Sequence, residues 1–107
     1  MARIWMIHPS DKDVTRAKEH SKLPDDQIFM HMYPDNKLDI FHPDLLMDDI
    51  KERTTRFMPD HMLLIAGNIL ANAMAIHVLL KRYDALDILV YNAKTGRYVR
   101  RTVSNVQ

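Results

Sequence analysis

The chain has 107 residues, of which 47% are hydrophobic, and its 15 basic and 14 acidic side chains leave a net charge of +1. This length and composition fit one domain over residues 1–107 with a packed core, and they exclude disorder throughout the chain. The absence of cysteine excludes disulfides, thiolate metal sites and cysteine nucleophiles, and two glycines are too few for a glycine-rich phosphate loop.

The first half of the chain predicts two strands and one long helix. Residues 2–8 and 28–33 are mostly apolar runs that stop at a proline, which is typical of buried strands. Between them we expect a short polar helix or turn over about 11–20. Pro43 suits the first position of a helix, and the apolar spacing that follows predicts a helix over 44–57.

The second half predicts three strands and a second long helix. Asn68 is expected to cap this helix at its N-terminus, and Gly96 is expected at the position of a hairpin turn that requires a positive φ. The expected ranges are 61–66, 86–92 and 97–103 for the strands and 69–83 for the helix.

The alternation of strands and helices predicts the fold class. Strands that alternate with helices favour an α/β fold with a mostly parallel sheet. The last two strands are joined by a short turn and are therefore expected to form an antiparallel hairpin. We predict a single small Rossmann-like domain with a C-terminal antiparallel hairpin, a layout that does not determine function.

The predicted helix over 69–83 is apolar around nearly its whole circumference, so it must be covered on more than one side. One interpretation is a homo-oligomer interface. The other is a central helix between the sheet and the first long helix, and both interpretations remain open. The expected interface residues are Ala71, Met74, Ala75 and Val78.

The predicted C-terminal hairpin combines basic and aromatic side chains. Such a surface can track phosphates with lysine and arginine while tyrosine stacks on an unpaired base. Charged residues on an edge strand also prevent aggregation between sheets, without any ligand. The candidate nucleic-acid-binding residues are Tyr91, Lys94, Arg97, Tyr98, Arg100 and Arg101.

Polar residues at the carboxyl ends of the predicted strands form an alternative site. Ligands of open parallel sheets bind beyond these ends, and a helix N-terminus can hold an anion. A nucleotide or phosphate pocket is therefore one hypothesis, although the same residue types commonly end strands and cap helices in any α/β fold. The residues concerned are His8, Ser10, Tyr33, Gly67, Asn68 and Asn92.

Charge is unevenly distributed along the chain. Residues 25–60 contain nine acidic and four basic side chains, whereas residues 61–107 contain six basic and two acidic ones. The acidic helix 44–57 could therefore act as a protein–protein inhibitor, a third hypothesis. The six histidines show no metal-ligand spacing, and we expect neither a metal nor a cofactor. No apolar run is long enough for a membrane span.

Three features of residues 61–101 occur together: a buried strand that ends in Gly67-Asn68, an alanine-rich helix, and the segment Tyr-Asn-Ala-Lys-Thr-Gly-Arg-Tyr over 91–98. In these features the chain resembles small α/β proteins encoded by bacteriophages. The resemblance implies a small accessory protein that acts on a host or viral target in the bacterial cytoplasm, and it brings no catalytic motif.

These observations favour a non-enzymatic, oligomeric protein that works by binding. The first hypothesis is binding of nucleic acid or of the host transcription or replication machinery through the basic hairpin. The small-ligand pocket and the acidic-helix inhibitor are the alternatives.

Overall fold

The computed structural model describes residues 3–7, 28–34 and 38–104, and every structural statement below concerns these residues. The predicted short helix over 11–20 lies outside them. The described residues contain β1 (Arg3–Met6), β2 (Ile28–His31), α2 (Pro43–Arg53), β3 (Met62–Leu64), α3 (Ile69–Arg82), β4 (Ala85–Asn92) and β5 (Arg97–Ser104).

The strands form one five-stranded sheet in the order β2-β1-β3-β4-β5. The pairs β1–β2, β1–β3 and β3–β4 are parallel, whereas β4 and β5 are antiparallel. The prediction of an α/β fold with a mostly parallel sheet and a C-terminal antiparallel hairpin is therefore confirmed. In the described residues, no helix is long and apolar enough to cross a lipid bilayer.

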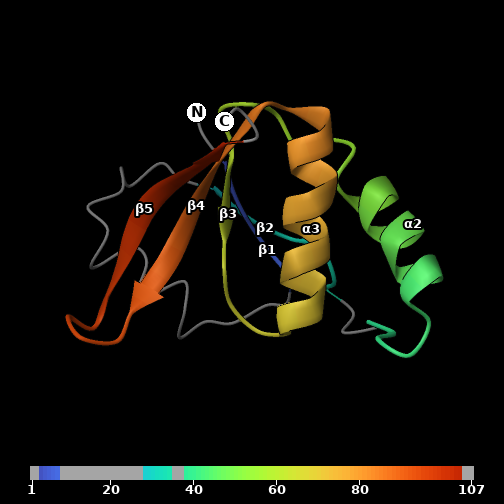
Figure 1. Ribbon diagram of the computed structural model, residues 1–107, viewed down its shortest axis with the longest axis horizontal. Coiled ribbons are helices and arrows are strands. Elements are labelled where there is room, and N and C mark those ends of the chain that lie inside the picture. Colours follow the sequence, from blue (N-terminus) through green and yellow to red (C-terminus); the bar gives the residue numbers. More distant parts are fainter. Residues whose placement is uncertain (1–2, 8–27, 35–37, 105–107) are drawn as a thin grey trace.

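Alternation along the strands places apolar side chains on both faces of the sheet. One face carries Trp5 and Leu63, which share a core with buried side chains of α2 and α3. Figure 1 shows both helices beside each other, with α3 next to the strands and α2 farther out. The opposite face carries Ile4, Leu64 and Leu89 in a second buried cluster. The first strand is thus buried on both faces, which agrees with the prediction of a buried strand over 2–8.

Helix α2 is shorter than predicted because an arginine of α3 satisfies its C-terminal carbonyls. The Arg82 guanidinium donates to the carbonyl oxygens of Thr54 at 2.6 Å and Lys51 at 3.3 Å. The Thr54 hydroxyl also donates back to the Ile50 carbonyl at 2.8 Å. The prediction that this helix continues to residue 57 is wrong, since α2 ends at Arg53.

Helix α3 begins at the predicted cap. The side chain of Asn68 accepts a hydrogen bond from the Ala71 amide at 3.0 Å. Ala71, Ala75 and Val78 are buried inside the chain, where they belong to the core shared with the sheet and α2. Helix α3 thus packs between the sheet and α2. Of the expected interface residues, these three side chains are not available to a second copy of the chain, and Met74 is half-buried.

Candidate interaction surface

The β4–β5 hairpin is held by a closely hydrogen-bonded turn. The Gly96 amide donates to the Asn92 carbonyl at 2.8 Å, and the Lys94 amide donates to the Asn92 side chain at 3.0 Å. Gly96 has a φ of +70°, a conformation that glycine adopts without strain. The antiparallel register that follows places Tyr91 opposite Tyr98, so the two faces of the hairpin carry different sets of side chains.

The first face of the hairpin uses much of its predicted nucleic-acid-binding set internally. Tyr98 is buried, and Tyr91 packs against it edge to face with ring centroids 5.5 Å apart. Arg100 forms an ion pair with Asp87, which also accepts a hydrogen bond from Thr102 at 2.7 Å. The hydrogen bonds from Thr102 and Arg100 lower the pKa of the Asp87 carboxyl, so Asp87 is ionised at neutral pH.

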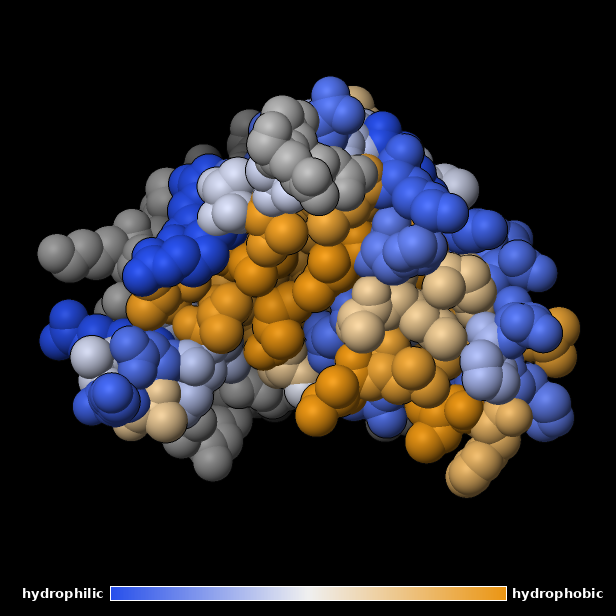
Figure 2. Space-filling model, viewed as in Figure 1, coloured by the Kyte–Doolittle hydropathy of each residue, from blue (hydrophilic) through white to orange (hydrophobic). Residues whose placement is uncertain are grey.

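The second face of the hairpin is apolar and hollowed. Figure 2 shows hydrophobic surface gathered between α3 and the hairpin, with hydrophilic residues along the side of β5. A hollow of about 470 Å³ lies on this hairpin. We call it the hairpin hollow; it is lined by Ile88, Val90, Tyr91, Asn92, Ala93, Lys94, Val99 and Arg101.

The floor and the rim of the hairpin hollow have different chemistry. Val90 and Val99 face each other across the two strands and remain half-exposed. Lys94 and Arg101 are exposed charged residues of the lining, and none of the lining residues is acidic. One guanidinium nitrogen of Arg101 donates to the Arg100 carbonyl at 2.9 Å, which holds the stem of the side chain along β5. The hairpin hollow therefore offers apolar contact together with positive charge.

Sequence reasoning found the basic residues of this surface but missed its apolar floor. The alternation of residues 97–103 already placed Val99 on the same face as Arg97 and Arg101. The same alternation in 86–90 aligns Ile88 and Val90 with each other. This alternation therefore already indicated an apolar face on the hairpin.

At the alternative site at the carboxyl ends of the strands, the described side chains of Tyr33, Asn68 and Asn92 have partners within the chain. Tyr33 is buried and donates its hydroxyl to Asp49 at 2.6 Å, so it does not face an open pocket. Asn68 caps α3, and the Asn92 side chain is used in the hairpin turn. Gly67 has a φ of +83°, as a chain reversal before a helix requires. His8 and Ser10 lie outside the described residues.

The acidic helix contributes part of its charge to the fold. Asp49 accepts hydrogen bonds from Arg53 at 3.0 and 3.1 Å in addition to the one from Tyr33. The Arg53 guanidinium also lies over the Tyr33 ring at 4.1 Å and donates to the Met32 carbonyl. Asp44 and Asp48 remain exposed. The third hypothesis thus retains an exposed acidic surface, although Asp49 fixes α2 to the end of β2.

Histidine does not form a metal centre in the described part of the chain. No group of three or more histidine, aspartate or glutamate side chains there could hold a metal ion. His61 is buried, and its Nδ1 accepts hydrogen bonds from the Trp5 indole and the Met58 amide, both at 3.1 Å. Burial lowers the pKa of His61, so the ring is neutral at pH 7 and serves as a hydrogen-bond acceptor of the core.

Comparison with known protein families finds a match. Residues 8–105 match the family described as phage Pam3 gp32-like protein. No curated protein matches the chain, and no solved structure matches it. The matched segment includes α2, α3 and the whole hairpin, so the candidate surface lies within the region that defines the match.

Proposed function

The chain belongs to the phage Pam3 gp32-like family, and on that premise we propose that it is a non-enzymatic accessory protein that binds a protein partner through its C-terminal hairpin. The partner is a protein of the bacterial host or of the virus, and the host cytoplasm is the expected compartment. The bound segment presents apolar side chains flanked by carboxylates.

The apolar floor of the hairpin hollow is the observation that carries this proposal. A volume of about 470 Å³ suits a few side chains of a partner. Val90 and Val99 supply apolar surface, and burial of such surface is the main favourable term in protein association. Lys94 and Arg101 supply positive charge, which orients an acidic segment and raises its association rate.

Nucleic acid fits this surface less well than protein does. The expected stacking residue Tyr98 is buried, and the Arg100 charge on the same face is balanced by Asp87. A nucleic-acid backbone has little apolar surface to bury on the valine floor, since its binding depends on neutralising charge. Lys94, Arg97 and Arg101 could still attract a polyanion, so nucleic acid is an outcome that the experiment distinguishes.

The Rossmann-like description of the domain also remains a proposal. Its support is the sheet order, in which the chain moves outward from β1 in both directions, first to β2 and then to β3. In open α/β sheets such a reversal marks the usual ligand crevice. A nucleotide ligand would favour this second candidate site, and a thermal shift with a nucleotide panel would detect it.

Fluorescence anisotropy with three labelled probes tests the protein-partner proposal. The first probe is a helical peptide with a leucine stripe flanked by glutamates, the second replaces each glutamate with lysine, and the third is a single-stranded oligonucleotide. We expect saturable binding of the acidic peptide alone. Val99→Asp and Arg101→Glu should each weaken it about tenfold or more, because each change introduces a repulsive charge into the hairpin hollow.

Two matched controls lie on α2 and just beyond its end. Leu45→Asp makes the same kind of change as Val99→Asp at an exposed leucine, and Arg56→Glu reverses an exposed charge. Both should leave the affinity within about twofold. Binding of the oligonucleotide that depends on Arg101 but not on Val99 would contradict the proposal and restore the nucleic-acid hypothesis. Self-association that Val99→Asp abolishes would instead identify a second copy of the chain as the occupant and would also contradict it.

A further inference from the structure

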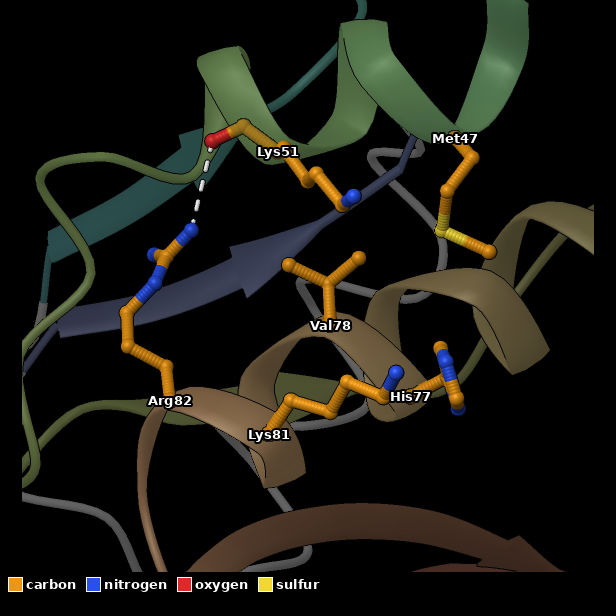
Figure 3. A pocket seen from close by; sticks show the side chains of 6 residues that line it. All are labelled: Met47, Lys51, His77, Val78, Lys81 and Arg82. Carbon is orange, nitrogen blue, oxygen red and sulfur yellow. Dashed lines mark hydrogen bonds between the residues drawn. The ribbon is translucent and has the colours of Figure 1, made fainter. Parts of the chain in front are cut away.

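A second cleft lies between α2 and α3, with a volume of about 270 Å³. It is separate from the hairpin hollow, since the two share no lining residue. Figure 3 shows the side chains of Lys51 and Lys81 reaching into this cleft from the two helices, with Val78 between them. The lining residues are Met47, Lys51, His77, Val78, Lys81 and Arg82.

Every ionisable side chain that lines this cleft is basic. In the part of the chain that the structure describes, neither Lys51 nor Lys81 forms an ion pair. The acidic residues close to these lysines in sequence are Asp48, Glu52 and Asp84, which are exposed and do not line the cleft. Two uncompensated ammonium groups on neighbouring helices repel each other, so an anion held between them would lower the energy of the arrangement.

Arg82, the arginine that lines the cleft, is held in place by hydrogen bonds to α2 and lies at one end of the cleft. Arg82 donates to the Thr54 and Lys51 carbonyls, as described above, and also lies 3.4 Å from the Thr54 hydroxyl. Its charge offsets the partial negative charge at the C-terminal end of α2. The lysines are therefore free to act on a ligand, because the helix end is already satisfied by Arg82.

The floor of the cleft strengthens this electrostatic effect. Val78 is buried, and Met47 is half-buried beside it. Apolar groups exclude water from one side of a bound ion, and charge interactions are stronger where water is excluded. The volume lies just below the range of about 300–1,000 Å³ that is usual for drug-sized ligands, which favours a small ligand.

We propose that this cleft binds a small multivalent phosphate between the ammonium groups of Lys51 and Lys81. Lysine binds phosphate as a point charge with three donors, and a compact anion with several oxygens can accept from both side chains at once. His77 at the edge of the cleft offers a further nitrogen. This site is independent of the hairpin hollow, so either proposal can fail without the other.

Titration with pyrophosphate at fixed ionic strength tests the proposal. Binding is measured by calorimetry and by shifts of the backbone amide signals of α2 and α3 in NMR spectra. Lys51→Met and Lys81→Met remove one charge each and keep an apolar stem of similar length. We expect saturable binding to the wild-type chain, about tenfold weaker binding for each single variant, and no detectable binding for the double variant. Arg56→Met, at an exposed arginine that lines neither the cleft nor the hairpin hollow, is the matched control and should leave the affinity unchanged.

Three results would overturn the proposal. The first is the absence of saturation up to about 10 mM pyrophosphate, because such a weak affinity would exclude a specific binding site. The second is an equal loss of affinity in Arg56→Met, which would indicate a response to net charge alone. The third is equally tight binding of citrate, which would assign the cleft to carboxylates. Because all the substituted lysines are exposed, the variants are expected to fold, and circular dichroism would verify this.

Discussion

Replacement of His61 by alanine should destabilise the fold by an amount set by its two hydrogen bonds and its ring contacts. The Trp5 indole N–H would lose its acceptor in a buried position, and an unsatisfied buried donor costs about 1–3 kcal/mol. The His61 ring also packs edge to face on Phe57 at 5.5 Å, a geometry worth about 0.5–1.5 kcal/mol. Water can reach the part-buried Met58 amide, so its loss adds little.

The expected decrease in the free energy of unfolding is thus about 1.5–4.5 kcal/mol at pH 8. Urea denaturation followed by circular dichroism would measure it, and a double-mutant cycle with Trp5→Phe isolates the hydrogen bond. In the Trp5→Phe background the orphaned donor is absent, so His61→Ala should cost less there. An equal cost in both backgrounds would refute the assignment of the indole to His61.

The same histidine makes stability depend on pH. Burial holds the pKa of folded His61 below its ordinary value of 6.5, so the unfolded chain takes up a proton more readily. The stabilisation is complete above pH 6.5 and is lost as pH falls from 6.5 through the folded-state pKa, with a slope of at most about 1.4 kcal/mol per pH unit. Urea midpoints measured across this window should fall for the wild-type chain and change less for His61→Ala.

Three further substitutions test other parts of the fold. Asp87→Asn removes the carboxylate that binds Arg100 and should lower the free energy of unfolding by about 1 kcal/mol or less at pH 7. Because the pKa of Asp87 is lowered in the folded chain, this difference from wild type should disappear as the pH falls below the ordinary pKa of 3.8. Urea denaturation at acidic pH would detect the change. Ala75→Asp places an unpaired charge in the core and should cost at least about 3 kcal/mol, whereas Ala73→Asp on the exposed side of α3 should cost less than about 1 kcal/mol, as thermal unfolding of both would show.

Local sequence signals were sufficient for most elements of the fold. Asn68 has the side chain that a helix cap requires, and Gly96 has the freedom of φ that the hairpin turn requires. Apolar runs identified β3, whose three residues are all buried, and β4, which carries apolar side chains on both faces. These features depend on near neighbours in the chain, which is why they could be predicted.

Contacts between distant residues explain what the sequence did not reveal. Helix α2 ends where Arg82 reaches its carbonyls from 28 residues away, which no local pattern indicates. The burial of Ala75 was equally compatible with a partner chain until the position of α2 was known. Likewise, Arg100 pairs with Asp87 only because of the strand register. The sequence therefore predicted more positive charge available for a ligand on the hairpin than the structure leaves unpaired.

Methyl NMR of the valine side chains tests the central claim most directly. On titration with the acidic amphipathic peptide, the methyl signals of Val90 and Val99 should shift in a saturable way, while those of Val78 in the core should remain in place. Unchanged Val90 and Val99 signals at saturating peptide, or shifts of the same size with an oligonucleotide, would contradict a protein-binding role for the hairpin hollow.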